Sequence, residues 1–129
     1  TWRREGAVMD GPVRLLVTAG SSRAGSYNGR LADIAAGLAR EAGAQVTRLD
    51  LHALDLPVFH AAIEAAGLPA GAFALRDAFA VHDAVFIASP EYNGFPTPLL
   101  INALAWASRV PAADGRLAGV YRKMHIPDD

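Results

Sequence analysis

Two short apolar segments constrain this chain most, because each is followed by a polar loop and then by a helical pattern. Residues 13–18 read VRLLVT and residues 84–88 read AVFIA. A nearly continuous apolar run of this length is typical of a strand in a parallel sheet that is covered on both faces. We therefore expect two buried parallel strands, each ending at a loop on the same edge of a sheet.

Helical patterns follow both strands. From Ser26, apolar residues recur at three- and four-residue steps until Gly43, which predicts an amphipathic helix with a glycine stop. A second helix is expected over residues 72–82. A third is expected over residues 97–109, where a capping threonine and a first-turn proline begin the pattern.

The segment between the first two helices contributes a further strand. Polar and apolar residues alternate over residues 45–51, which predicts an edge strand with one face more exposed to solvent than the other. The stretch that follows, up to Gly71, is punctuated by proline and glycine and is expected to be irregular.

This order of elements implies an α/β fold, a doubly wound parallel sheet with helices on both faces. Right-handed crossovers place the third strand on the far side of the first, so the expected strand order is two, one, three. The first helix then covers one face, and the second and third helices cover the other. The loops at residues 20–28 and 89–97 meet at a switch point, which is where an open α/β sheet binds its ligand.

Composition narrows the kind of ligand. The chain has 129 residues, a net charge of −1, four histidines and no cysteine. This charge offers no basic surface for nucleic acid, and no apolar run approaches the roughly 20 residues that span a membrane. Disulfides and thiolate chemistry are excluded, and the histidines lack metal-ligand spacing. We expect a soluble, cytoplasmic protein with a small-molecule partner and neither a nucleic-acid nor a membrane partner.

The first loop carries residue types that suit a phosphate. It lacks the G-x-G-x-x-G motif, and Ser26 stands where a P-loop needs lysine. Hydroxyls, one cation and one amide remain at the start of a helix, whose free N–H groups favour an anion; they are Ser21, Arg23, Ser26 and Asn28. The alternative is an ordinary turn with a helix cap, because turns prefer the same residues.

The second loop places a carboxylate, a phenol and an amide directly after a strand. Tyr92 and Phe95 offer aromatic faces for a flat ring, while prolines restrain the loop around a flexible glycine, Gly94. The alternative is a proline-rich connection without a ligand.

Two segments of the chain resemble the NADPH-dependent FMN reductase family. They are residues 20–32, GSSRAGSYNGRLA, and residues 90–109, PEYNGFPTPLLINALAWASR. The resemblance extends over about residues 13–109 and implies a flavodoxin-like, three-layer αβα fold. It also implies FMN as cofactor and NADPH or NADH as co-substrate. The implied electron acceptor is a quinone, an azo compound, a metal ion or a flavin. No acid, base or nucleophile is then needed from the protein, because the flavin carries the chemistry.

The resemblance also implies which residues bind the cofactor. The first loop would hold the FMN phosphate and the second would line the ribityl chain and ring; the residues are Ser21, Arg23, Ser26, Tyr27, Asn28, Pro90, Glu91, Tyr92, Asn93 and Gly94. Two alternatives stay open, a non-catalytic FMN-binding module and an inactive fragment. A flavodoxin-type electron carrier is disfavoured, because the chain lacks strong acidity.

The third helix departs from the family pattern at two positions. Ile101 and Ala105 stand where the family usually has Lys and Asp, four residues apart on one face. The helix becomes apolar nearly all round, which indicates burial on more than one side. We expect a homo-oligomer, a dimer or tetramer, with core packing as the alternative. Association would also cover Val85 and Ile87, for which we expect no covering helix.

The ends of the chain are expected to lie outside the domain. We assign residues 1–12 to an extension, residues 13–115 to a C-terminally incomplete flavodoxin-fold domain with a candidate fourth strand at 116–121, and residues 116–129 to a divergent tail. Residues 119–129 resemble a segment of the carbon–nitrogen hydrolase family, of the carbamoylputrescine amidase kind. Lys123 matches the lysine of its Glu-Lys-Cys triad, but a chain without cysteine cannot form that triad.

Overall fold

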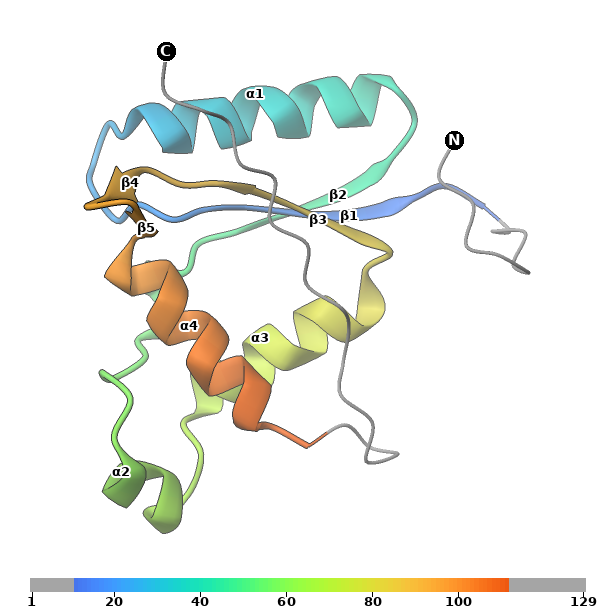
Figure 1. The fold of residues 1–129 in the computed structure, drawn as a ribbon. Helices are drawn as coiled ribbons and strands as arrows, with labels where there is room; N and C mark the ends of the chain where they lie inside the picture. Colours follow the sequence, from blue (N-terminus) through green and yellow to red (C-terminus); the bar gives the residue numbers. More distant parts are fainter. Residues whose placement is uncertain (1–10, 112–129) are drawn as a thin grey trace.

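The computed structural model describes residues 11–111, whose centre is a parallel sheet of three strands (Figure 1). β1 (Arg14–Ala19) lies in the middle, between β2 (Gln45–Leu49) and β3 (Ala84–Ala88). Both pairings are parallel. The expected order two, one, three is therefore confirmed, and it is the order in which a flavodoxin-like sheet begins.

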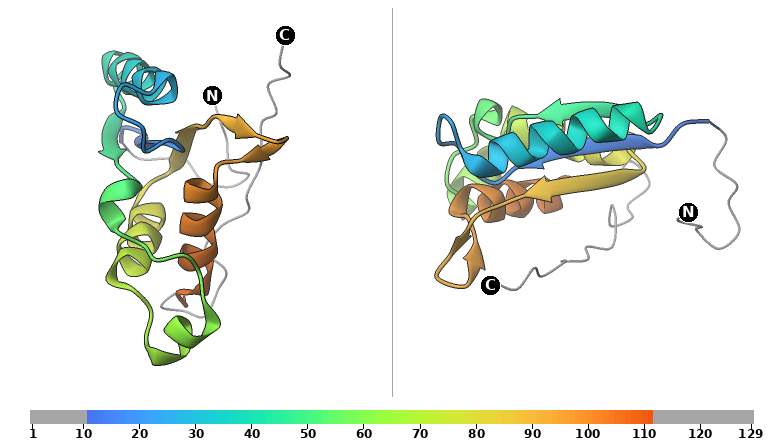
Figure 2. Two further views of the ribbon diagram at one scale, coloured as in Figure 1. Left: turned by 90° about the vertical axis from the view of Figure 1, so that its left-hand side faces the viewer. Right: turned by 90° about the horizontal axis from the view of Figure 1, so that it is seen from above.

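Helices cover both faces of this sheet (Figures 1 and 2). α1 (Tyr27–Glu41) lies on one face, and α3 (Ala70–Val81) and α4 (Pro98–Arg109) lie on the other. The layout expected from right-handed crossovers is confirmed, and the fold is flavodoxin-like. The candidate fourth strand and the hydrolase-like segment lie outside the described residues.

The helix boundaries follow their local signals. The Ser26 hydroxyl accepts a hydrogen bond from the Gly29 N–H at 3.3 Å, which caps α1, and Gly43 follows the helix with a φ of 97°. Thr97 caps α4 in the same way, with Pro98 at the first helical position. Both starts were expected from the sequence.

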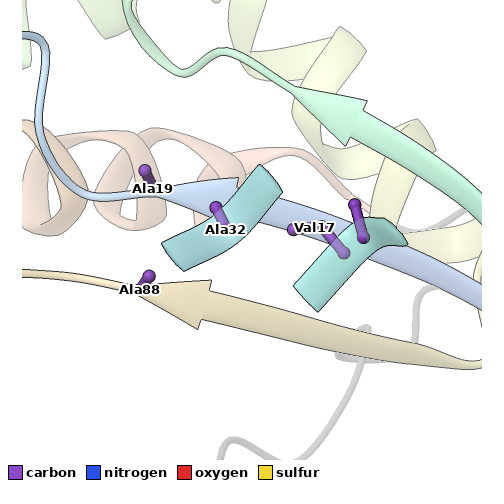
Figure 3. Close-up of a cluster of buried hydrophobic side chains, with 5 residues drawn as sticks. Val17, Ala19, Ala32 and Ala88 are labelled. Atoms are coloured by element: carbon purple, nitrogen blue, oxygen red, sulfur yellow. The ribbon is translucent and has the colours of Figure 1, made fainter. Parts of the chain in front are cut away.

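The core under α1 is built from small side chains. Val17, Ala19, Ala32 and Ala88 gather between α1 and the sheet (Figure 3). Larger apolar residues of α1 point elsewhere, since Leu31, Ile34 and Leu38 are 47%, 60% and 61% exposed. The amphipathic pattern therefore predicted the helix correctly but not which of its faces is buried. The helix packs on the sheet through its alanines, and its buried residues are Ala32 and Ala36.

The opposite face has a larger core. Leu51, Leu75 and Leu100 form one cluster under α3 and α4, and Ile87 packs against it. Trp106 is fully buried in an adjoining cluster with Ala72 and Val110. The expectation that Ile87 lacks cover is wrong, because the third strand turns this side chain toward α3 and α4.

β3 is less buried than its apolar sequence indicates. Val85 is 40% exposed and Phe86 is 36% exposed, so the expectation of a buried strand is wrong. The reason is its position, since within residues 11–111 β3 is an edge strand paired only with β1. Only Ala88, at the carboxyl end, is buried.

The segment expected to be irregular contains two short helical elements, a 3-10 helix (η1, His52–Leu54) and α2 (Ala61–Ala66). Side chains of α4 hold this segment against the domain. The Trp106 Nε1 and the Asn102 Nδ2 both donate to the Pro57 carbonyl, at 2.7 and 2.8 Å. These contacts are long-range, so a local pattern did not show them.

Candidate functional site

The two loops chosen from the sequence meet at the carboxyl edge of the sheet. The Gly20 N–H donates to the Ala88 carbonyl at 2.7 Å, and the Thr97 hydroxyl donates to the Gly20 carbonyl. A Cβ atom at Gly20 would lie 2.8 Å from the Ser89 Cβ and 3.2 Å from the Thr97 Oγ1. The expected switch point is confirmed, and it requires glycine at position 20 because the second loop fills the space of a side chain.

The first loop forms a compact turn that leads into α1. The Ser21 Oγ accepts from the Arg23 N–H at 3.3 Å, and the Ser26 N–H donates to the Arg23 carbonyl at 3.2 Å. Gly25 has a φ of 70°, a left-handed conformation that favours glycine. The turn places the loop beside the first turn of α1, where backbone N–H groups lack helical partners.

A shallow hollow of about 260 Å³ opens beside this loop. Three of the ten expected cofactor residues line it, namely Ser21, Arg23 and Ser26. Tyr27 and Asn28 lie in the first turn of α1; the Tyr27 side chain is 82% exposed, and Asn28 is half-buried. The full lining is Ser21, Ser22, Arg23, Gly25, Ser26, Gly29, Arg30, Asp33, Arg48, Asp50 and His52.

One wall of the hollow was missed in the sequence. Arg48 and Asp50 come from the carboxyl end of β2 and the residue after it, and His52 begins η1. A strand that pairs in parallel with β1 ends at the same edge of the sheet as β1. The expected place of β2 beside β1 could therefore have predicted that the residues at its carboxyl end contribute to the site.

The hollow has a surplus of positive charge. Arg48 is already paired, because its Nε donates to the Asp33 Oδ1 at 2.9 Å and its Nη1 donates to the Leu49 carbonyl at 2.8 Å. Within residues 11–111 neither Arg23 nor Arg30 makes an ion pair. The guanidinium of Arg30 instead lies 5.9 Å from the centre of the Tyr27 ring.

The donor set fits a phosphate ester. In the described part of the chain, the backbone N–H groups of Ser22, Ala24 and Gly25 have no hydrogen-bond acceptor. Free N–H groups, two hydroxyls and an unpaired arginine at a helix N-terminus are the donors that a phosphate dianion accepts. The residues present are therefore compatible with the phosphate end of FMN.

The second loop is a β-hairpin rather than a flexible connection. β4 (Glu91–Tyr92) pairs antiparallel with β5 (Phe95–Pro96), and Asn93 and Gly94 form the turn with φ values of 53° and 80°. Two positive φ values define a type I′ turn, for which Asn-Gly is the strongest sequence signal. That signal was present at these positions, so the hairpin was missed although the sequence contains it.

The hairpin of β4 and β5 projects at the edge of the molecule (Figure 2), and it carries two exposed aromatic side chains. Tyr92 and Phe95 stand opposite each other in the ladder and are 52% and 66% exposed. Directly opposed residues of a hairpin lie on the same face, so the two rings share one side. The hairpin residues do not line the hollow: the structure joins the bases of the two loops but does not gather all ten expected residues in one cavity.

These features define a class of protein: a flavodoxin-like domain with a phosphate-compatible loop and a second loop at the switch point. The sequence pattern of the family described as "NADPH-dependent FMN reductase" matches residues 13–122. The chain belongs to this family.

Known relatives agree with this assignment. The chain is 40% identical to a probable NADPH:quinone oxidoreductase 1 of Oryza sativa subsp. japonica over 102 residues, which is 75% of this chain and 50% of the relative. It is 33% identical to an NAD(P)H-dependent FMN reductase of Pseudomonas aeruginosa over 103 residues, 80% of this chain and 54% of the relative.

A solved structure is also similar. The flavoenzyme NAD(P)H:(acceptor) oxidoreductase FerB from Paracoccus denitrificans superposes with a TM-score of 0.61 and 31% identity, over 76% of this chain and 52% of FerB. The chain spans about half the length of the relatives it matches.

Two further properties bear on the site. No helix within residues 11–111 has the length and apolar character needed to cross a membrane. Across the same residues, no cluster of three or more histidine, aspartate or glutamate side chains is arranged to hold a metal ion.

Proposed function

We propose that this chain is the FMN-binding part of an NAD(P)H-dependent oxidoreductase that reduces small molecules. The observation that carries the proposal is the positively charged hollow beside the first loop, at the carboxyl edge of the sheet, in a chain that belongs to the FMN reductase family. When bound, FMN supplies the redox chemistry, so the protein contributes binding and orientation rather than an acid, a base or a nucleophile.

The two loops take different parts of the cofactor in this proposal. The first loop holds the phosphate through Arg23, the serine hydroxyls and the backbone N–H groups, with Tyr27 and Asn28 beside it. The hairpin lines the ribityl chain and the ring, through the five residues from Pro90 to Gly94. Exposed aromatic rings suit a planar ligand, because stacking favours flat apolar surfaces.

The proposed acceptor is a quinone. This acceptor is supported by the names of relatives, among them the probable NADPH:quinone oxidoreductase 1 of Oryza sativa. The hairpin side of the site is exposed at Tyr92 and Phe95, which leaves room for a second flat molecule to approach. NADPH or NADH is the proposed electron donor, and a chain without cysteine suits a reducing cytoplasm.

A flavin titration tests this proposal. We expect FMN fluorescence to be quenched on binding, and riboflavin to bind at least tenfold more weakly because it lacks the phosphate. NADPH should then bleach the visible flavin band of the complex. Quenching without bleaching by NADPH or NADH would support a non-catalytic FMN-binding module instead. Absence of quenching would overturn the proposal.

We also propose that copies of the domain at residues 13–115 associate. Ile101 is 46% exposed on α4, and Val85 and Phe86 add apolar surface at the sheet edge. Burial of such surface favours association by about 25 cal/mol per Å². The double variant Ile101→Lys with Ala105→Asp should shift the chain toward the monomer in light scattering. A stable monomer of the unmutated chain at micromolar concentration would contradict this.

A further inference from the structure

We propose that Thr97 is a positioning residue: its buried hydroxyl fixes the phosphate loop against the base of the hairpin, and so sets how FMN is held at both ends. The inference deepens the proposed function and rests on it. Thr97 is not among the residues expected to contact the cofactor. It was expected only as the cap of α4.

The hydroxyl of Thr97 makes two hydrogen bonds in a buried setting. It donates to the Gly20 carbonyl, which lies 77 residues away in the sequence, and accepts from the Leu100 N–H at 3.2 Å. Thr97 is 2% exposed, and in the described part of the chain only Thr18 is an equally buried polar residue. A buried hydroxyl with both bonds made holds its neighbours firmly, because breaking either bond leaves a polar group unpaired.

These bonds fix the peptide unit from which the phosphate loop begins. The Gly20 N–H is bonded to the Ala88 carbonyl at 2.7 Å, so Gly20 is held by β3 at one end and by Thr97 at the other. In a trans peptide the C=O and the next N–H point in opposite directions. The bond from Thr97 therefore aims the Ser21 N–H away from α4 and sets where the loop begins.

The same residue fixes the hairpin. Thr97 directly follows β5 and is the N-cap of α4, so the hairpin and the helix join at this side chain. Gly20 also lacks the space for a Cβ atom, since Ser89 and Thr97 fill it. The two loops are thus in contact at one point, and Thr97 supplies the side-chain hydrogen bond across it.

The experiment compares FMN with riboflavin in three variants of the full chain. Thr97→Val removes the hydroxyl at nearly constant volume, and Thr97→Ser keeps it. Thr18→Val is the matched control, because the Thr18 hydroxyl is equally buried but donates to the Leu49 carbonyl of the neighbouring strand at 2.8 Å. Dissociation constants for both flavins come from fluorescence quenching, and stability comes from urea denaturation.

We expect Thr97→Val to lower FMN affinity about tenfold and to reduce the ratio of FMN to riboflavin affinity, because the phosphate loop loses its fixed position. Thr97→Ser should restore the ratio. Thr18→Val should lower stability by a similar amount and leave the ratio within about twofold of the unmutated chain.

Two other outcomes would overturn the inference, and they are distinguishable. If the unmutated chain binds FMN but Thr97→Val keeps the ratio, or if Thr18→Val lowers it equally, Thr97 has a structural role only. If the unmutated chain does not bind FMN at all, the proposed function fails and the inference fails with it.

Discussion

The first loop and the hairpin lie at the same edge of the sheet, but different interactions hold them in shape. The first loop is fixed by side-chain and turn hydrogen bonds, such as those of Ser21 and Ser26, and by the start of α1. The hairpin is fixed by its own backbone ladder and by a type I′ turn at Asn93 and Gly94. Side-chain oxygens of its own serines hold the first loop, whereas backbone hydrogen bonds hold the hairpin.

The two loops also differ in what they offer a ligand. The first is concave and polar, with an unpaired cation and free N–H groups, whereas the hairpin projects and carries exposed rings. A ligand held by both would be bound through charge at one end and through apolar contact at the other. This difference can be tested, because salt weakens only the first kind of interaction.

The largest expected effect comes from breaking the contact between the loops. Gly20→Val should destabilise the domain by about 3 kcal/mol and abolish FMN binding, because its side chain would overlap Ser89 and Thr97. Urea denaturation measures the first effect and flavin titration the second. The control is Gly37→Ala in α1, where nothing lies within 4 Å of the added Cβ. This control should stabilise the helix by about 0.5–1 kcal/mol. If Gly20→Val changed neither stability nor FMN binding by much, the two loops could separate without loss of the site.

The next largest effect distinguishes the residues proposed to bind the phosphate end of FMN from those proposed to bind its other end. Arg23→Ala should weaken FMN binding by about tenfold to a hundredfold, because it removes a charge-assisted bond to a phosphate dianion. Glu91→Ala on the hairpin should have a smaller effect. Arg40→Ala, an exposed cation in the last turn of α1, controls for net charge. Equal or reversed losses for Arg23 and Glu91 would place the phosphate away from the first loop.

Local sequence patterns predicted the framework that brings these loops together. The strand order, both helix caps and the meeting of the two loops at the switch point followed from apolar runs, capping residues and right-handed crossovers. These signals are local or topological, so a single sequence contains them. The family resemblance added the cofactor and the candidate residues, which spacing alone did not supply.

Other features depended on contacts that the sequence does not display. Helical spacing marks both the alanine row of α1 and the row with Ile34 and Leu38, and only the close approach to the sheet decides that the alanines are buried. The wall of the hollow that contains Arg48 involves a long-range pair, because Arg48 is bonded to Asp33, 15 residues away in the sequence. The exposure of Phe86 depends on the position of β3 in the sheet. A run of apolar residues looks the same in the sequence whether its strand lies in the centre or at the edge.

Ionic strength should have a smaller effect on flavin affinity, and this effect should differ between the two loops. Raising the salt concentration from about 0.05 to 0.5 M should weaken FMN binding about threefold to fivefold, because screening acts on the exposed cations of the hollow. Riboflavin affinity should change by less than about twofold, since riboflavin carries no charge. In Arg23→Ala the salt dependence for FMN should shrink. Parallel curves for FMN and riboflavin would mean that charge contributes nothing at the first loop.

The smallest effect compares two glycines with similar positive φ values. Gly25 in the first loop and Gly94 in the hairpin turn have φ values of 70° and 80°, and an added Cβ has no close neighbour at either. Alanine at either position should therefore cost about 1–2 kcal/mol of stability through backbone strain alone. Gly25→Ala should also weaken FMN relative to riboflavin, about threefold, because strain in the first loop displaces its N–H groups from the phosphate. Gly94→Ala should weaken both flavins alike, so that their affinity ratio stays constant. The reverse pattern, with the ratio changed only by Gly94→Ala, would place the phosphate against the hairpin turn.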